Sequence, residues 1–143
     1  MIDELYSARI LRLAANMPHA GRLAAPGATS EKVSRLCGSR VVVDVVMADG
    51  RVAEFAQDVR ACALGQAAAA ILGEHVVGAR LDELAAGRDG LRAMLKEGAA
   101  PPPGRFADLA VLAQVREFPA RHASTLLAFE AVIEAATLAE AGG

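Results

Sequence analysis

A run of valines that ends in a turn signal limits the folds open to this chain more than any other feature. Five of the eight residues from Arg40 to Met47 are valine, and β-branched side chains favour strands. Asp49-Gly50 follows directly, and this dipeptide favours two-residue hairpin turns because glycine tolerates a positive φ angle. Arg51 to Val59 then returns as the partner strand. The sequence predicts a β-hairpin, with Glu31 to Leu36 as a third, shorter strand.

Helical patterns lie on both sides of this hairpin in the sequence. The expected helices share apolar side chains spaced three and four residues apart. They cover Ile2 to Asn16, Ala63 to Val77, Leu81 to Lys96, Phe106 to Gln114 and Ala120 to Ala139. One helix, a three-stranded antiparallel sheet and then several helices define an α+β fold.

Two segments are expected to be loops. Leu23 to Thr29 contains Pro26 and Gly27, which are typical of turns. Gly98 to Gly104 contains three consecutive prolines and should be stiff. It is expected to be an internal loop rather than a domain boundary, because too little chain follows it to fold alone. Residues 1–143 are therefore predicted to form a single domain.

Composition and the lack of known motifs exclude several functions. The formal net charge of the 143 residues is −2, with charges of both signs interspersed, whereas nucleic-acid binding needs a basic patch. No apolar run approaches the roughly 20 residues of a membrane span. The motifs GxxxxGK[ST], GxSxG, HExxH and CxxC are missing, so no enzyme class is indicated. We expect a cytoplasmic protein that is not an enzyme and binds neither nucleic acid nor membranes.

The two cysteines flank the predicted hairpin. Cys62 lies where a strand meets the start of an alanine-rich helix, and a helix N-terminus favours a thiolate. The alternative is a buried, inert side chain, since free cysteine is commonly buried. Cys37 precedes the valine-rich strand, so strands of similar length should bring both cysteines to one end of the sheet. Two thiolates are only half of the four ligands that a zinc or iron–sulfur site usually has.

Several short motifs occur in an order that characterises a known family. They are Pro18-His19-Ala20-Gly21-Arg22-Leu23, Cys37-Gly38-Ser39, Cys62-Ala63-Leu64-Gly65-Gln66-Ala67, Val76-Val77-Gly78, Phe118-Pro119-Ala120-Arg121 and His122-Ala123-Ser124-Thr125-Leu126-Leu127-Ala128-Phe129. In this order and spacing the chain resembles the IscU/SufU/NifU N-terminal family of iron–sulfur cluster assembly scaffolds, and most closely the SufU-like branch. The resemblance covers nearly the whole length.

The resemblance implies a site at one end of the molecule. In the family three cysteines and one aspartate hold zinc, iron or a nascent [2Fe–2S] cluster, and the cysteines accept sulfur from a cysteine desulfurase. Cys37 and Cys62 match the first two cysteines. Ser39 stands where the family has aspartate, and Ser124 where it has the third cysteine. A different register places Ala123 at the third cysteine, beside His122.

The two substitutions weaken the expected ligand set, because a neutral hydroxyl is a poor metal ligand. His122 is a candidate replacement, since imidazole binds zinc and iron. A homodimer that shares two cysteines from each chain would also restore four ligands. The resemblance implies a scaffold that passes a cluster from a desulfurase to apo iron–sulfur acceptor proteins. The alternatives are a partner-binding module that docks a desulfurase without metal, and a sulfur relay that uses Cys62 with His122 as acid or base.

Overall fold

The predicted hairpin forms the centre of a three-stranded antiparallel sheet. The computed structural model describes residues 7–35 and 38–142. β2 (Ser39–Ala48) and β3 (Arg51–Arg60) are joined through Asp49 and Gly50, whose φ angles are 54° and 75°. Both are the positive values that this turn type requires. The α+β architecture and the hairpin are confirmed.

The first strand is longer at its start than expected. β1 (Ala28–Ser34) pairs with β2, and the strand order is β1-β2-β3. The loop predicted over Leu23 to Thr29 is therefore two residues too long, because Ala28 and Thr29 pair with β2. The Thr29 hydroxyl also donates to Asp44 at 2.6 Å. Leu36, the last residue of the expected strand, lies outside the described residues.

The long helices follow the predicted pattern, with corrections at their ends. The first described helix begins at Ala8, where the Ser7 hydroxyl caps it by accepting from the Ile10 N–H at 3.3 Å. Residues 2–6 of the helix expected over Ile2 to Asn16 lie outside the described residues. The long helices are α2 (Ala8–Ala15), α3 (Ala63–His75), α4 (Leu81–Glu97) and α5 (His122–Gly142).

The segment expected as a short helix over Phe106 to Gln114 is instead built of 3₁₀ turns. This element, η1 (Gly104–Glu117), buries four apolar side chains. They are Phe106, Leu109, Leu112 and Val115. These residues recur every three positions, and a 3₁₀ helix with three residues per turn places such a set on one face. A second short 3₁₀ element, η2 (Pro119–Arg121), leads into α5.

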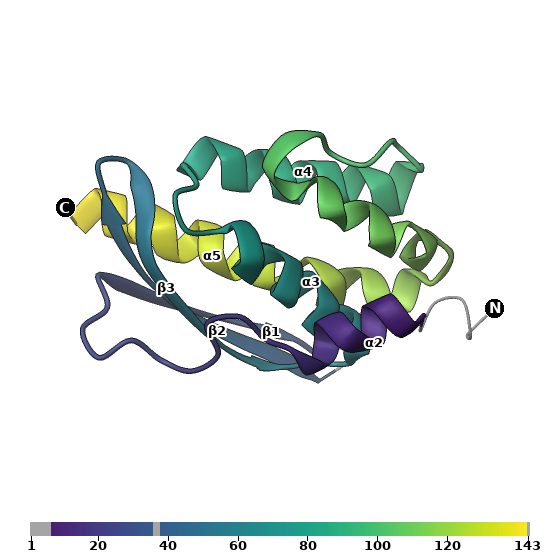
Figure 1. Ribbon diagram of the computed structural model, residues 1–143, viewed down its shortest axis with the longest axis horizontal. Coiled ribbons are helices and arrows are strands. Elements are labelled where there is room, and N and C mark those ends of the chain that lie inside the picture. Colours follow the sequence, from purple (N-terminus) through teal and green to yellow (C-terminus); the bar gives the residue numbers. More distant parts are fainter. Residues whose placement is uncertain (1–6, 36–37, 143) are drawn as a thin grey trace.

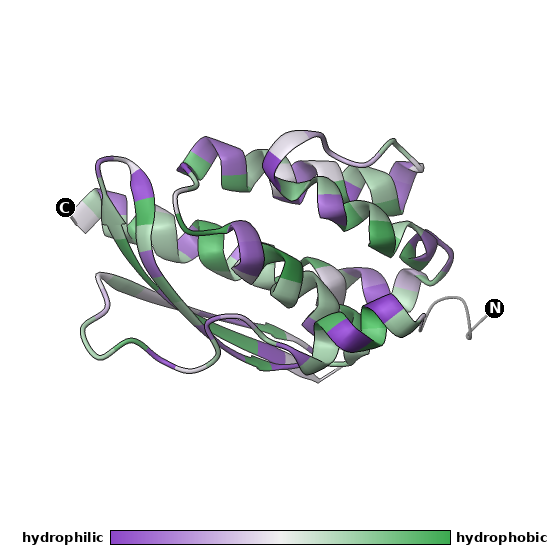
Figure 2. Ribbon diagram, in the orientation of Figure 1, coloured by the Kyte–Doolittle hydropathy of each residue, from purple (hydrophilic) through white to green (hydrophobic). Residues whose placement is uncertain are grey.

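The elements form three layers, with α5 in the middle (Figure 1). α3 and α5 cover one face of the sheet, and α4 and η1 lie beyond them. α5 contacts β1, β2, α3 and α4, so it buries side chains almost all round. The hydrophobic residues gather on the facing surfaces of these layers (Figure 2). No helix in the described ranges is both long and apolar enough to cross a membrane.

Two glycines inside α4 allow the proline-rich loop and η1 to pack onto it. A Cβ at Gly87 would lie 2.8 Å from the Phe106 ring, and one at Gly90 would lie 2.7 Å from Cβ of Pro102. Each glycine costs a helix interior about 1 kcal/mol relative to alanine. The absence of a side chain at these two positions lets Phe106 and Pro102 pack closely against the helix.

A buried carboxylate ties the segment before β1 to the outer face of the sheet. Asp44 of β2 is fully buried and accepts two hydrogen bonds from the Arg22 guanidinium, at 2.6 and 3.0 Å. It also accepts from the Leu23 N–H at 3.0 Å and from the Thr29 hydroxyl. These hydrogen bonds hold the loop against β2 at Asp44.

Candidate functional site

Cys62 lies at the junction between the sheet and α3, as the sequence predicts. β3 ends at Arg60, and Cys62 is the extended residue that precedes the first turn of α3, with φ −66° and ψ 170°. Its side chain is half-buried and is a free thiol. Backbone N–H groups at the start of a helix lack helical partners and carry partial positive charge. The thiol is thus both accessible and placed where negative charge is favoured.

Ser124 of the first turn of α5 contacts this thiol. The Ser124 Oγ lies 3.4 Å from the Cys62 Sγ, and Ser124 is only 1% exposed. The close approach of the two helices depends on Gly65, because a Cβ there would lie 2.8 Å from Cβ of Ala61 and 3.1 Å from the Ser124 carbonyl oxygen. The structure therefore brings together the two residues that the family motifs align with a second and a third cysteine.

The surroundings of Cys62 favour its thiolate. Burial alone would raise the pKa of the thiol, but four other effects lower it. They are the Ser124 hydrogen bond, the N–H groups of Gly65 and Leu64, and the positive charge of Arg121. The net result is a pKa of Cys62 below its ordinary value. A larger thiolate fraction at neutral pH makes the sulfur a better nucleophile and a better metal ligand.

Alkylation of the thiol tests this electrostatic arrangement. Replacing Ser124 by alanine removes the hydrogen bond and is expected to raise the pKa of Cys62, which moves the alkylation profile to higher pH. The rate of iodoacetamide labelling is measured against pH in a Cys37→Ser background, so that only Cys62 reacts. Ser30→Ala is the matched control, because Ser30 is equally buried but bonds Glu134. Identical profiles for both variants would contradict the role of Ser124.

Ser39 lies at the same end of the sheet as Cys62. Arg40 and Arg60 are cross-strand partners, so the start of β2 and the end of β3 are neighbours. Ser39 is 1% exposed, and among the described residues its hydroxyl has no hydrogen-bond partner. Cys37, the other predicted thiolate ligand, lies outside the described residues. Its distance from Cys62, and the ligand roles of Cys37 and Ser39, stay predictions.

Both ring nitrogens of His122 have hydrogen-bond partners within the chain. Its Nε2 lies 3.0 Å from the Val115 carbonyl oxygen and 3.2 Å from that of Arg116, so this nitrogen donates. Its Nδ1 lies 3.4 Å from the Lys96 ammonium and accepts. Both ring nitrogens are therefore in use, whereas a metal needs a free lone pair. The ligand role of His122 stays a prediction, and these contacts favour a structural role.

Two further residues shape the site without having been assigned a chemical role from the sequence. Arg121 was recognised only as part of the Phe118-Pro119-Ala120-Arg121 motif, yet its charge acts on Cys62. Gly65 allows α3 to approach α5. A glycine in the first turn of a helix is a signal of close packing that sequence reasoning could have used.

The described residues offer no ready-made metal centre. Across 7–35 and 38–142, no three histidine, cysteine, aspartate or glutamate side chains gather closely enough to hold a metal ion. Within the described part of the chain, Cys62 therefore does not belong to a set of three such ligands. Any iron or cluster at Cys62 needs Cys37, a second protein chain or a small-molecule ligand to complete it.

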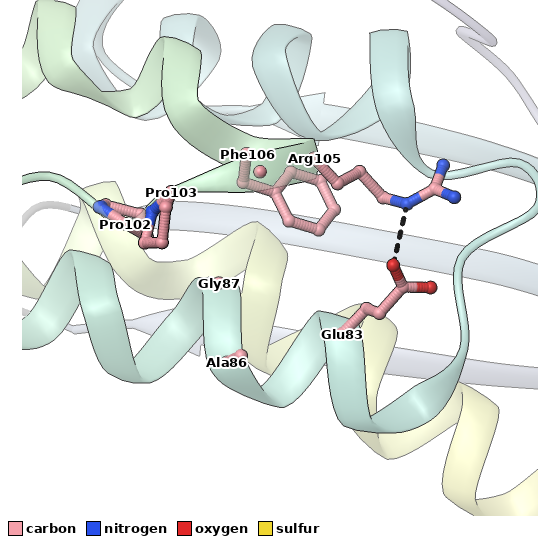
Figure 3. A pocket seen from close by; sticks show the side chains of 8 residues that line it. Glu83, Ala86, Gly87, Pro102, Pro103, Arg105 and Phe106 are labelled. Carbon is pink, nitrogen blue, oxygen red and sulfur yellow. Dashed lines mark hydrogen bonds and ion pairs between the residues drawn. The ribbon is translucent and has the colours of Figure 1, made fainter.

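A separate pocket of about 240 Å³ lies between α4 and the start of η1 (Figure 3). Its lining is mostly apolar, and at one end the Arg105 guanidinium donates to Glu83 at 3.4 Å. Arg105 also donates to the His75 carbonyl oxygen at 2.9 Å. No cysteine, histidine or serine lines this pocket, and it shares no lining residue with the Cys62 site.

The fold and the site define a class: an α+β domain that presents a thiol where its three-stranded sheet meets a helix. The chain belongs to the NifU-like N-terminal domain family, whose pattern it matches over residues 5–125. The resemblance inferred from the motifs is thereby confirmed.

Solved structures support this membership. The chain is 48% identical to a nitrogen-fixing NifU-like protein (N-terminal) from Brucella abortus, with a TM-score of 0.95 and 99% of each chain covered. A hypothetical protein is 25% identical, with a TM-score of 0.82 over 93% of this chain and 97% of its own. A candidate SUF-system iron–sulfur cluster assembly scaffold from Fervidobacterium islandicum AW-1 shares the fold at 17% identity, with a TM-score of 0.84 over 92% and 96%. No curated protein matches the chain.

Proposed function

We propose that this chain is a scaffold-like protein of iron–sulfur cluster assembly. It binds iron or a nascent [2Fe–2S] cluster through Cys37 and Cys62 and passes the cluster to apo iron–sulfur proteins. The observation that carries the proposal is the Cys62 thiol in a family member, at a helix N-terminus, with its pKa lowered by Ser124 and Arg121. Thiolates are the ligands that iron–sulfur clusters use.

The ligand supply makes this binding transient. A cluster normally has four protein ligands, and the chain has two cysteines in all. Two chains that each offer two thiolates would complete the set as a homodimer around one cluster. Weak holding suits a protein that hands its cargo on. The same shortage argues against tight, autonomous zinc binding, since structural zinc sites are closed by four ligands.

A second candidate function, sulfur relay, is favoured by the nucleophilic character of Cys62. The Cys62 thiolate attacks the terminal sulfur of a persulfide on a cysteine desulfurase. A new S–S bond forms on Cys62, the old S–S bond breaks, and the desulfurase cysteine leaves as a thiolate. No net oxidation occurs. Either function needs reduced thiols, so the proposal places the protein in the reducing cytoplasm. A module that docks the desulfurase without accepting sulfur is the third reading.

Sulfur loading separates these functions. The chain is incubated without oxygen with a cysteine desulfurase and cysteine, and persulfide on Cys62 is measured by mass spectrometry. Ferrous iron and an apo-ferredoxin are then added, and cluster arrival on the ferredoxin is recorded. The scaffold reading predicts cluster transfer that depends on both cysteines. If persulfide forms on Cys62 and cluster transfer to the ferredoxin does not need Cys37, the sulfur-relay function replaces the scaffold function. If the chain binds the desulfurase but neither the Cys62 persulfide nor a cluster on the ferredoxin is detected, only the docking-module function remains.

A further inference from the structure

The polar groups that act on the Cys62 sulfur are hydrogen-bond donors or cations. The Ser124 hydroxyl lies 3.4 Å from the sulfur, and the N–H groups of Leu64 and Gly65 donate to it. Arg121 acts on the sulfur through its positive charge. None of these groups carries a negative charge. An anion that enters this site therefore meets donors and a cation that are already in place.

Arg121 lies on the same side of its helix as Ser124. The two residues are three positions apart, and residues at this spacing are neighbours on the surface of both 3₁₀ and α-helices. The Thr125 hydroxyl donates to the Arg121 carbonyl oxygen at 2.7 Å, so helical geometry already holds at Arg121. Because Ser124 contacts the Cys62 Sγ, the Arg121 side chain leaves its helix on the side of the thiol.

The charge of Arg121 is not neutralised within the described ranges. Its guanidinium forms no ion pair with a residue of 7–35 or 38–142, whereas Arg60, near the same end of the sheet, lies 3.9 Å from Asp58. A guanidinium presents its N–H donors as a planar fork that matches a carboxylate. The free charge at Arg121 therefore indicates an external anion, and a carboxylate fits it best.

Ser39 supplies a further donor at this end of the sheet. Arg40 and Arg60 are cross-strand partners, so Ser39 comes level with the residue that precedes Cys62. Its side chain shares a strand face with that of Val41, which packs in the core under the helices. Ser39 is 1% exposed, and no described residue pairs with its hydroxyl. A buried hydroxyl without a partner is costly, so this donor indicates a group from outside the chain.

We propose that the Cys62 site binds small sulfur compounds that carry a carboxylate. The sulfur of the ligand lies beside Cys62 and accepts from the Ser39 hydroxyl, and its carboxylate pairs with Arg121. The use of this site rests on the proposed function, because a bound thiolate supplies an iron or cluster ligand that the two cysteines of the chain do not. The chain then completes its ligand set from free thiols rather than from a second copy.

Thiol–disulfide exchange at Cys62 measures this selectivity without any metal. Three reagents of similar size are compared: dithiodipropionate is anionic, hydroxyethyl disulfide is neutral and cystamine is cationic. The Cys62 thiolate attacks one sulfur of the reagent and forms a new S–S bond. The old S–S bond breaks, and the other half of the reagent leaves as a thiolate, so no net oxidation occurs. The chain carries Cys37→Ser, so that only Cys62 reacts.

The measured quantity is the rate with dithiodipropionate divided by the rate with cystamine. Arg121→Gln should lower this ratio about ten-fold, the scale of a charge–charge contact at a partly exposed site. Any change in the thiolate fraction of Cys62 affects both rates equally, and the leaving thiols are the same for every variant, so both effects cancel. Arg121→Lys keeps the charge and should retain most of the ratio.

Two further variants complete the comparison. Arg60→Gln is the matched control, because Arg60 is 73% exposed near the same end of the sheet, and salt should screen it to an effect below about two-fold. Ser39→Ala should slow exchange with all three reagents by a common factor of about two to ten, the scale of one hydrogen bond to the leaving sulfur.

Two outcomes would overturn the proposal. The first is a rate ratio that Arg121→Gln leaves unchanged. The second is an equal fall of the ratio for Arg60→Gln, which would make the general field of the chain the cause. Reconstitution with iron and sulfide in mercaptopropionate or in cysteamine tests the proposed function separately. Selective exchange without a cluster in either thiol would support the binding site and contradict the scaffold function.

Discussion

Asp44→Ala is expected to lower the free energy of unfolding by about 2–4 kcal/mol, the scale of several lost hydrogen bonds to a charged group. The carboxylate is fully buried and accepts from Arg22, Leu23 and Thr29, so its removal releases the loop from the sheet. The cost stays below that of a fully buried pair, because the Arg22 side chain is 53% exposed and can be solvated. Urea unfolding measures the change.

The same carboxylate predicts how stability depends on pH. Burial raises the pKa of Asp44, but hydrogen bonds from Arg22, Thr29 and Leu23 and the charge of Arg22 outweigh burial, so the pKa lies below its ordinary value. Its stabilising contribution is complete above the unfolded pKa of about 3.9 and is lost as the pH falls through the lower folded value. Asp44→Asn should flatten this acid dependence.

A matched carboxylate separates the effect of Asp44 from a general effect of charge. Asp58 lies on the neighbouring strand with its side chain 40% exposed, and its nearest cation, Arg60, is 3.9 Å away. Asp58→Ala should change stability by no more than about 0.5 kcal/mol. Equal losses for the Asp44 and Asp58 variants would contradict the account of the buried carboxylate.

Ser124→Cys is expected to make the proposed iron or cluster site bind more tightly. The new sulfur would occupy the position of an oxygen that lies 3.4 Å from the Cys62 Sγ, and would add a third thiolate to Cys37 and Cys62. Thiolates are strong ligands for zinc and iron, whereas hydroxyls are poor ones. We expect the lifetime of a reconstituted cluster, and the affinity for zinc, to rise about 10- to 100-fold, the range in which changes around a metal site act.

Ser30→Cys is the control for this gain of function. It also adds a third cysteine at a buried serine, but Ser30 contacts Glu134 and lies further along the sheet. Both variants are compared under reducing, oxygen-free conditions, so that the Cys62 thiol cannot form a disulfide with the new one. Equal gains in the two variants would mean that thiol number, rather than the position of Ser124, sets the affinity.

The strands were the most predictable part of the fold. β-branched residues and Asp49-Gly50 act locally, and the hairpin they predict is present. The start of β1 was not predictable in this way. Thr29 belongs to the strand because it pairs with Asp44 of β2, a residue 15 positions away, and its hydroxyl also bonds the Asp44 carboxylate. Pairing across the sheet therefore overrode the loop signal of Pro26 and Gly27.

The 3₁₀ character of η1 corresponds to a pattern in the sequence, although the sequence analysis predicts only a short helix there. Its buried residues recur every three positions from Phe106 to Val115, whereas an α-helix would bury residues three and four apart. Two glycines in the interior of α4 would by themselves predict a weaker helix. The structure shows their use, since Phe106 and Pro102 occupy the space that side chains would fill.

The site was predictable in part, and only through family motifs. The local sequence is compatible with Cys62 as either a reactive thiol or a buried, inert one. The alignment of the family motifs predicts that Cys62 lies close to Ser124. The contact is present. The orientation of His122 follows from helix geometry, because residues two apart on an α-helix point roughly 200° apart. With Ser124 directed at Cys62, His122 turns instead toward Lys96 and Val115.

Anaerobic reconstitution with iron and sulfide tests whether Cys37 and Cys62 hold a cluster. The visible absorption spectrum and the iron content per chain are measured for the wild type, Cys37→Ser and Cys62→Ser. We expect a coloured protein whose absorption and iron are lost in both variants, with one [2Fe–2S] cluster for two chains if the homodimer shares it. A wild-type protein that stays colourless and free of iron, just as its cysteine variants do, would contradict the scaffold function.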